Sequence, residues 1–457
     1  MIPRADRDFL VSLAIAGALV TACNGAARSA ETQRPNVVVL ISDDHHHGAL
    51  GCAGNTVVRT PQLDRLAAGG VHFTHCFTPN PICTPSRACI LTGQDSWTNG
   101  VTFFGKPIAA ASPQWPKLLS SAGYETFFTG KWHNEGVPAE HGFTSGANIF
   151  VGGMSNHAQV PLVNFGERPG PKTTRTGTGF SSELFADAAV NFLNSEHHGP
   201  FCLYAAFTAP HDPRMPPAEF AAMYSAETVP LPPNFMPQPP LELYISGIRD
   251  EKLLAFPRTE ADVRRETALY YGMLTHLDRQ IGRILDALDE QHLAQDTLVI
   301  FVGDHGLSLG AHGVVGKQTL YEEGVRTPLI VRYPRLNRGP SECHDLTSLI
   351  DIFPTICEAA GVAIPANVEG RSLLTAYRGD ASAARSELFA TYHDLQRSVR
   401  TTQFKLIAHL RSHAIELFDL THDPFEMKNL AGDSAHADVQ KRLEARLAAW
   451  RAGTPGK

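Results

Sequence analysis

The residues best suited to chemistry follow two apolar runs. An Asp-Asp pair closely follows Asn36–Ile41, and a Gly-Asp-His-Gly segment begins where Thr297–Val302 ends. Both runs are typical of buried parallel strands, whose carboxyl ends form the ligand-binding edge of an α/β sheet. Adjacent carboxylates repel each other, and a bound hard cation lets both stay ionised, although an Asp-Asp pair alone is more often a helix-capping turn. The two segments together predict a divalent-cation site with ligands Asp43, Asp44, Asp304 and His305.

Three histidines, His45-His46-His47, directly follow the Asp-Asp pair. Imidazole is a common metal ligand, so the triplet invites a metal-binding interpretation. We interpret it instead as a polar loop in which at most one ring faces the site. None of the three is included among the expected ligands.

The most specific motif is Cys83-Thr84-Pro85-Ser86-Arg87, followed by Leu91-Thr92-Gly93. It resembles the C-x-P-x-R signature of the formylglycine-dependent sulfatase family, in which a maturing enzyme oxidises the cysteine to formylglycine. Further segments match the family in the same order: Gly130-Lys131-Trp132-His133, Pro210-His211-Asp212, Gly303–Gly306, Gly316-Lys317, Thr319–Glu323 and Glu416–Pro424. The resemblance implies an alkaline-phosphatase-like fold and the reaction of a sulfuric ester hydrolase.

The resemblance also assigns roles. It implies that the cation, Ca²⁺ or alternatively Mg²⁺, is held by Asp43, Asp44, Asp304, His305 and an oxygen of the modified Cys83. Arg87 and Lys131 neutralise negative charge on the nucleophile and the sulfate, and Lys317 reaches the sulfate. His211 protonates the leaving oxygen. His133 takes a proton during sulfate release, and Asp304 assists deprotonation of the attacking hydroxyl. The catalytic set is therefore Cys83, Arg87, Lys131, His133, His211, Asp304 and Lys317.

Two positions depart from the family pattern. Gln94 stands where many members have Arg, and His305 where several have Asn. Imidazole and amide each offer a lone pair to a cation, so the second change preserves the predicted site.

A sulfated carbohydrate is the expected substrate. A phosphonate or phosphate ester hydrolase of the same superfamily and a non-catalytic sulfated-glycan binder are the alternatives. Arg214 either meets a second acidic group on the sugar or pairs with a nearby acid at the surface, and the sequence does not separate these interpretations.

The elements that must position these residues alternate along the chain. Strands are predicted at 36–41, 126–129, 201–207, 297–302 and 328–333, and helices at 62–69, 115–122, 181–194, 263–290 and 346–360. This alternation predicts an α/β fold with a mixed, mostly parallel sheet sandwiched by helices. Residues 144–180 and the proline-rich 210–257 are expected to be irregular, functional loops.

The pattern of predicted elements changes after about residue 378. Two strands, at 405–410 and 415–420, and a helix at 437–450 predict a small C-terminal α+β subdomain. The expected domains are a catalytic domain at 35–380 and this subdomain at 381–457.

The N-terminal residues carry an export signal. Arginines precede the apolar run Phe9–Val20, which is too short to span a bilayer but fits a signal peptide over residues 1–22. Val20-Thr21-Ala22-Cys23 resembles a bacterial lipobox, which predicts lipidation of Cys23 and a tether over residues 23–34. The expected location is the periplasm or the outer membrane of a bacterium, as a lipoprotein, with ordinary secretion as the alternative.

Composition excludes other classes. The 457 residues carry 39 Lys+Arg against 46 Asp+Glu, a net charge of −7. This balance argues against a nucleic-acid binder and against membrane binding other than through the lipid. The length allows about three domains, or one large domain and a small one. Six cysteines besides Cys23 and Cys83 permit disulfides without indicating their pairing, and Cys202 is expected to be a buried thiol.

Overall fold

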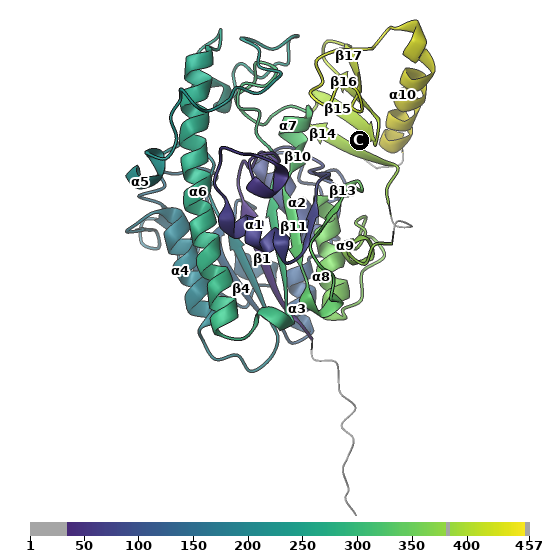
Figure 1. Ribbon diagram of the computed structural model, residues 1–457. Helices are drawn as coiled ribbons and strands as arrows, with labels where there is room; N and C mark the ends of the chain where they lie inside the picture. The colour runs from purple at the N-terminus through teal and green to yellow at the C-terminus, as the bar shows by residue number, and fades with distance from the viewer. Residues whose placement is uncertain (1–33, 381–383, 453–457) are drawn as a thin grey trace, which may run out of the picture. The chain divides into compact units, whose positions relative to one another are not determined.

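A computed structural model of the chain describes residues 34–380 and 384–452 (Figure 1). The predicted signal peptide, Cys23 and nearly all of the predicted tether lie outside these residues. Within the described part of the chain, no helix is long and apolar enough to cross a membrane.

The main sheet has eight strands among the described residues and is mixed but mostly parallel, as predicted. In spatial order they are β12 (Ser341–Cys343), β2 (Val71–Phe73), β11 (Leu329–Arg332), β9 (Thr297–Gly303), β1 (Asn36–Ser42), β8 (Phe201–Ala206), β4 (Glu125–Lys131) and β5 (Ser145–Phe150). The four central strands β9, β1, β8 and β4 are parallel to one another, and only β11 runs antiparallel to its neighbours. The carboxyl ends of the four therefore meet at one edge.

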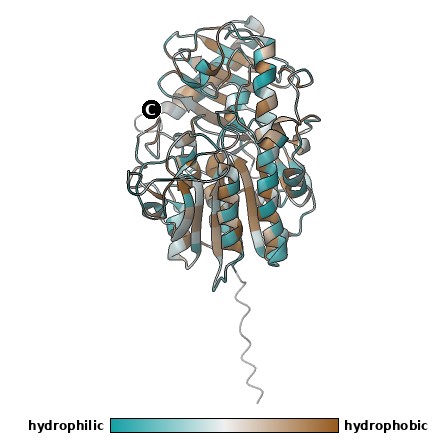
Figure 2. Cartoon of the chain, turned by 90° about the vertical axis from the view of Figure 1, so that its left-hand side faces the viewer, coloured by the Kyte–Doolittle hydropathy of each residue, from teal (hydrophilic) through white to brown (hydrophobic). Residues whose placement is uncertain are grey.

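Helices cover both faces of the sheet. The described helices are α1 (Pro61–Ala68), α2 (Cys83–Thr92), α3 (Trp115–Ser121), α4 (Ser181–Leu193), α5 (Ala218–Ala221), α6 (Glu260–Glu290), α7 (Glu322–Val325), α8 (Ile352–Ala360), α9 (Leu373–Tyr377) and α10 (Ala437–Ala452). Val38 and Leu40 of β1 pack with α1, α4 and α6, whereas Val37, Val39 and Ile41 pack with α2, α3, α8 and α9. Because β1 is buried on both faces, its residues 37–41 are continuously apolar. Figure 2 shows that the strands of the sheet are mostly hydrophobic, whereas the helices in front of them carry both hydrophilic and hydrophobic residues.

The small C-terminal part is an antiparallel sheet with a helix. Its strands are β14 (Glu387–Tyr392), β15 (Gln396–Thr401), β16 (Phe404–His409) and β17 (Ile415–Asp419), and Leu443 and Leu447 of α10 pack against them. A buried lysine of β16, Lys405, contacts Glu322 of α7 at 3.2 Å and so ties this sheet to the catalytic part. The fold class is confirmed, and the boundary near residue 380 stays a prediction.

Several local predictions were wrong. The predicted helix over 346–360 begins only at Ile352, because residues 347–348 form β13 and Ser348 and Asp351 build a capping box over a 3₁₀ turn. The stretch 144–180 is not wholly irregular, since it contains β5 and the short pair β6 (Pro161–Leu162) and β7 (Arg175–Thr176).

Other elements gave no clear signal in the sequence. The first two strands of the C-terminal sheet, β14 and β15, were missed, as was α2. So were the short β3 (Cys76–Phe77) and β10 (Arg326–Thr327), which pair with each other. The thiols of Cys52, Cys76, Cys202, Cys343 and Cys357 are free, and that of Cys202 is buried as expected.

A bulge in β4 sets the direction of its last residues. The register with β5 shifts between Thr129 and Gly130, and Gly130 has a φ of 97°. A Cβ on Gly130 would lie 1.9 Å from the carbonyl oxygen of Ala206. Only glycine fits here, immediately before Lys131.

We expect Gly130→Ala to destabilise the protein more than Gly123→Ala does. Gly123 has a similar φ of 88° but open space around its Cβ position, so its substitution isolates backbone strain of about 1–2 kcal/mol. At Gly130 the clash with Ala206 adds about 1–3 kcal/mol. Chemical denaturation of both variants measures the difference, and equal losses would show that the close approach is unimportant.

Candidate active site

The predicted site residues converge at the carboxyl ends of the four central strands. Asp43 follows β1, Asp304 follows β9, and Lys131 is the last residue of β4. His211 lies five residues beyond β8. All four side chains are buried, and they come from strands adjacent in the sheet.

Cys83 begins α2 and points into this cluster. Its Sγ lies 3.5 Å from Asp43 Oδ1 and 3.3 Å from His305 Nε2. Burial raises the pKa of the thiol, but Lys131, Lys317 and His305 outweigh it and hold the pKa well below its usual range. The positive end of the helix dipole also favours negative charge at this position.

Three buried cations face the carboxylates. Arg87 Nε donates to Asp304 Oδ2 at 3.0 Å, and Arg87 Nη1 donates to the carbonyl oxygen of Lys131 at 2.9 Å. The ammonium of Lys131 contacts Asp43 Oδ2. Lys317 Nζ donates to Asp44 Oδ1 at 2.6 Å. The arrangement can therefore bind an anion beside a metal ion.

The acidic residues fit a hard divalent cation. One ligand atom each from Asp43, Asp44, Cys83 and His305 lies within 4.8 Å of the others, and Asp304 Oδ1 is 3.5 Å from His305 Nε2. Burial and the neighbouring Asp43 raise the pKa of Asp304 to about 6. A bound cation would relieve this repulsion between carboxylates.

His305 needs a proton change to act as a ligand. Burial lowers its pKa, but Asp304 and Cys83 outweigh burial and raise it to about 9. A metal ion binds only the neutral imidazole, so cation binding would release this proton.

His133 lies beside the nucleophile position. Its side chain hydrogen-bonds with Cys83, and burial together with Lys131 lowers its pKa to about 4, which keeps the ring neutral and able to accept a proton. Its ring stacks on Phe104 at a centroid distance of 5.5 Å. Phe104 is one of the exposed large apolar residues.

His211 is oriented by its own backbone neighbourhood. Its Nδ1 donates to the carbonyl oxygen of Asp212 at 2.8 Å, which leaves Nε2 toward Asp44 Oδ2, 3.9 Å away. Burial lowers the pKa of His211, but Asp44 outweighs burial and raises it to about 9. The buried His157 Nε2 donates to the carbonyl oxygen of His211 at 2.9 Å and fixes the turn.

Sequence reasoning missed several residues of this cluster. Asp250 Oδ2 is 3.6 Å from Lys317 Nζ, and Asp250 also contacts Arg249. Both residues, like Asp212, come from the proline-rich stretch 210–257. The stretch was predicted to be functional, but no pattern within it distinguishes these side chains from surface charges.

The structure resolves the open question about Arg214. Its side chain is buried and its Nη1 donates to Glu266 Oε2 at 2.8 Å. It pairs with an acid, but not at the surface, and its charge is not available to a substrate. Gln94, the other unusual position, is buried beyond the far end of α2 and donates to the carbonyl oxygen of Asn367 at 2.8 Å.

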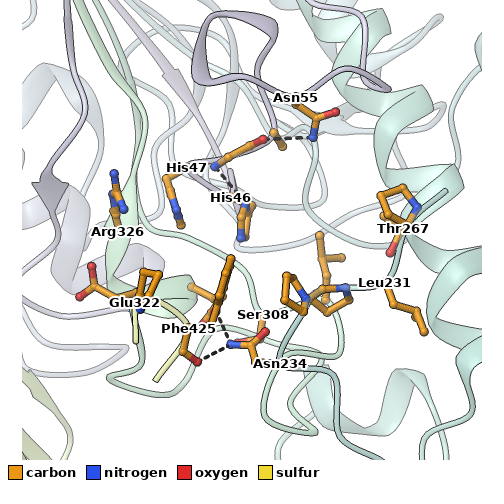
Figure 3. Close-up of a pocket in the computed structure, with 18 of the residues that line it drawn as sticks. His46, His47, Asn55, Leu231, Asn234, Thr267, Ser308, Glu322, Arg326 and Phe425 are labelled. Carbon is orange, nitrogen blue, oxygen red and sulfur yellow. Dashed lines mark hydrogen bonds between the residues drawn. The ribbon is translucent and has the colours of Figure 1, made fainter. Parts of the chain in front are cut away.

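The histidine triplet lies outside the cation cluster. His45 Nδ1 is 2.9 Å from Ser42 Oγ, whereas His46 and His47 stack on each other at 4.5 Å. These two rings line a separate cavity of about 400 Å³, together with residues of α6, of α7 and of the 230–234 segment (Figure 3). None of the three rings belongs to the group formed by Asp43, Asp44, Cys83 and His305, which is consistent with the predicted ligand set.

Comparison with known proteins gives the family context. The sulfatase family model matches residues 35–362, and a model described as N-sulphoglucosamine sulphohydrolase, C-terminal, matches residues 310–453.

Curated relatives align over most of the chain. It is 29% identical to N-acetylglucosamine-6-O-sulfatase of Bacteroides thetaiotaomicron, over 90% of this chain and 85% of that protein. It is 27% identical to the ulvan-active sulfatase of Formosa agariphila, over 96% and 85% respectively. A solved structure in complex with its substrate D-glucosamine-2-N,6-O-disulfate has a TM-score of 0.81 and 26% identity, covering 92% of this chain and 98% of that chain.

The acidic cluster predicts a measurable cation dependence. We expect millimolar Ca²⁺ to raise the melting temperature of the wild type, because a ligand that binds only the folded state stabilises it. The shift should shrink strongly in Asp43→Asn and Asp304→Asn, which each remove a negative charge. Glu323→Gln removes a buried carboxylate of a different cluster and should keep the shift. Unchanged Ca²⁺ affinity by calorimetry in both aspartate variants would show that the cation site lies elsewhere.

Proposed function

The chain belongs to the sulfatase family and is a sulfuric ester hydrolase, and we propose that it removes sulfate from a carbohydrate with formylglycine, derived from Cys83, as the nucleophile. The observation that carries the proposal is the position of Cys83 at the first turn of α2. There it faces two buried lysines, an arginine and the cation-binding carboxylates. The hydrated aldehyde carries two hydroxyls on one carbon, so one can act as the nucleophile and the other can help to release the sulfate. A serine has only one hydroxyl and would remain a stable sulfate ester, and an unmodified cysteine has none.

The chain's own residues then divide the work. Lys131 and Arg87, which contact Asp43 and Asp304, hold negative charge near the nucleophile, and Lys317, which contacts Asp44, binds a sulfate oxygen. Asp43, Asp44, Asp304 and His305 would hold a divalent cation, for which we propose Ca²⁺ because carboxylate oxygens dominate the set. The bound cation supplies further charge neutralisation at the sulfate.

Two histidines move protons in this scheme. His133, kept neutral by burial and Lys131, accepts a proton beside position 83 during sulfate release. His211, whose Nε2 faces away from the turn that holds Nδ1, donates a proton to the leaving oxygen. Asp304, which lies 3.0 Å from Arg87 and 3.5 Å from His305, assists removal of the first proton.

Support for a carbohydrate substrate comes from the relatives. Two of the aligned proteins are named for action on N-acetylglucosamine 6-O-sulfate and on ulvan, and the aligned structure holds a disulfated glucosamine. We extend the substrate class, a sulfated sugar, to this chain. The complete set of buried ligands and cations argues against a non-catalytic glycan binder.

The nucleophile is tested by mass spectrometry and substitution. Co-expression with a formylglycine-generating enzyme should lower the mass of the peptide containing Cys83 by about 18 Da, since the CH2SH group becomes CHO and one oxygen replaces the sulfur and two hydrogens. Cys83→Ala should reduce sulfate release to below about a thousandth of the wild-type rate, the usual consequence of losing a covalent nucleophile. Cys89→Ala, a buried cysteine on the same helix, is the matched control.

Faster turnover of phosphate diesters than of sulfate esters would favour the alternative function, a phosphonate or phosphate ester hydrolase of the same superfamily.

The role of His211 is tested by the leaving group. A sugar alkoxide leaves poorly without a proton, whereas nitrophenolate leaves well. His211→Ala should slow hydrolysis of a sugar sulfate by about 10²–10⁴-fold and that of nitrophenyl sulfate much less. Initial rates for both substrates at saturating Ca²⁺ measure the contrast. Equal losses would make His211 a sulfate-binding residue.

We propose that the protein is exported and anchored through a lipid on Cys23, on the basis of the N-terminal sequence alone. Metabolic labelling with palmitate should mark the wild type and not Cys23→Ala. Equal labelling of the two would contradict the anchor and leave ordinary secretion.

A further inference from the structure

Arg249 stands at the outer side of the catalytic cluster. Its side chain is 43% exposed, whereas the two carboxylates that hold it, Asp212 and Asp250, are each 6% exposed. Arg249 Nη2 lies 2.9 Å from Asp212 Oδ1, and Arg249 Nε lies 3.0 Å from Asp250 Oδ1. The Nε and Nη2 atoms of the guanidinium are thus held by buried carboxylates, whereas Nη1 is not.

The same two carboxylates connect Arg249 to the reaction site. Asp212 Oδ1 also lies 3.2 Å from His211 Nδ1, and Asp250 Oδ2 lies 3.6 Å from Lys317 Nζ. Asp212 therefore links Arg249 to His211, which is assigned to protonate the leaving oxygen. Asp250 links Arg249 to Lys317, which is assigned to the sulfate. Arg249 is thus placed to meet a sugar whose ester oxygen binds at His211.

The outward edge of Arg249 lacks a strong acceptor. Its Nη1 contacts the thioether sulfur of Met154. Sulfur is a weak hydrogen-bond acceptor, and Met154 is itself 47% exposed. A carboxylate or sulfate oxygen would be a much better partner for this N–H group, because charge-assisted hydrogen bonds are roughly twice as strong as neutral ones.

Arg249 is the more exposed of the two arginines in this stretch. Asp212 and Asp250, which hold it, also lie near His211 and Lys317. Arg214, the other arginine, is buried and its Nη1 donates to Glu266. Arg249 thus combines fixed orientation, exposure and an outer N–H group without a strong acceptor.

We propose that Arg249 forms an anion subsite beside His211 and Lys317, which binds a second acidic group, a sulfate or a carboxylate, on the sugar that carries the scissile sulfate or on its neighbour. Met154 is displaced when the anion binds. The inference rests on the proposed function, since it specifies which sulfated sugars the enzyme prefers. A guanidinium suits either group, because its planar donors match both kinds of oxygen pair.

The subsite is tested by competition assays, which compare how tightly different sulfated sugars inhibit hydrolysis of a reporter substrate. The sugars themselves do not have to be hydrolysed. The reporter is hydrolysis of 4-nitrophenyl sulfate by the matured full-length enzyme at saturating Ca²⁺. The competitors are glucosamine 6-sulfate against glucosamine 2-N,6-O-disulfate, and N-acetylgalactosamine 6-sulfate against the same sugar linked to glucuronate. The first pair adds a sulfate and the second adds a carboxylate, so the two sources of negative charge are separated.

In the wild type we expect the competitor with the second anion to bind about ten- to a hundredfold more tightly in at least one pair, the range for a hydrogen bond to a charged group. Arg249→Met should abolish the ratio, and Arg249→Lys should restore part of it. Arg65→Met is the matched control, because Arg65 is similarly exposed (45%) and contacts Asp286 and Asp289 far from the site. It should leave the ratio unchanged.

Two results would overturn the subsite: a wild-type ratio near one in both pairs, or an unchanged ratio in Arg249→Met. If the ratio is unchanged because both members of a pair bind more weakly by the same factor, Arg249 only positions His211 through Asp212. Absence of nitrophenyl sulfate hydrolysis by the matured wild type is a separate outcome, which contradicts the proposed function itself.

Discussion

The structure depends on a set of charges held out of water at one edge of the sheet. Asp43, Asp44 and Asp304 are buried opposite Arg87, Lys131 and Lys317. Each of these ions alone would cost several kcal/mol to bury, and the cost is offset only where partners lie at hydrogen-bond distance. The geometry therefore has to be fixed before the charges can coexist. The surrounding apolar core supplies that rigidity, because side chains on both faces of β1 are packed among helices.

The parallel arrangement explains why these residues meet although they are far apart in the sequence. Asp43 and Asp304 are 261 positions apart, yet the strands that precede them are direct neighbours with Ser42 opposite Gly303. Apolar strands and the polar residues at their ends are both visible in the sequence, and parallel pairing then brings the ends together. For this reason Asp43, Asp44, Asp304 and His305 could be predicted as one cluster. Lys131 and His133 could be assigned only through the family motif, because a bulge at Gly130 that no composition signal marks sets their direction.

Other parts of the site could not be predicted, for physical reasons. Helix α2 is buried along its whole length, so it lacks the alternation of polar and apolar residues that normally reveals a helix. Strand β5 lies at the edge of the sheet and carries Gly146 and Asn148, residues typical of loops. Arg214 and Arg249 stand in the same proline-rich stretch, and their sequence surroundings give no reason to rank one above the other. The structure separates them, because Arg214 is buried and pairs with Glu266 of α6 and is therefore a poor candidate for binding an acidic group of the substrate.

The division between strand ends and loops bears on how such a site distinguishes substrates. The groups assigned to the sulfate itself lie on β4, on α2 and beyond β1 and β9, and they are buried. Arg249, for which we propose an anion subsite, lies on a segment outside the sheet and is 43% exposed, and its neighbour Met154 is exposed as well. A substitution among the buried ions leaves an unpaired charge in a low-dielectric interior, whereas an exposed side chain can change at little cost in stability. The contacts around the sulfate are therefore constrained by folding, and the choice of sugar can vary independently of them.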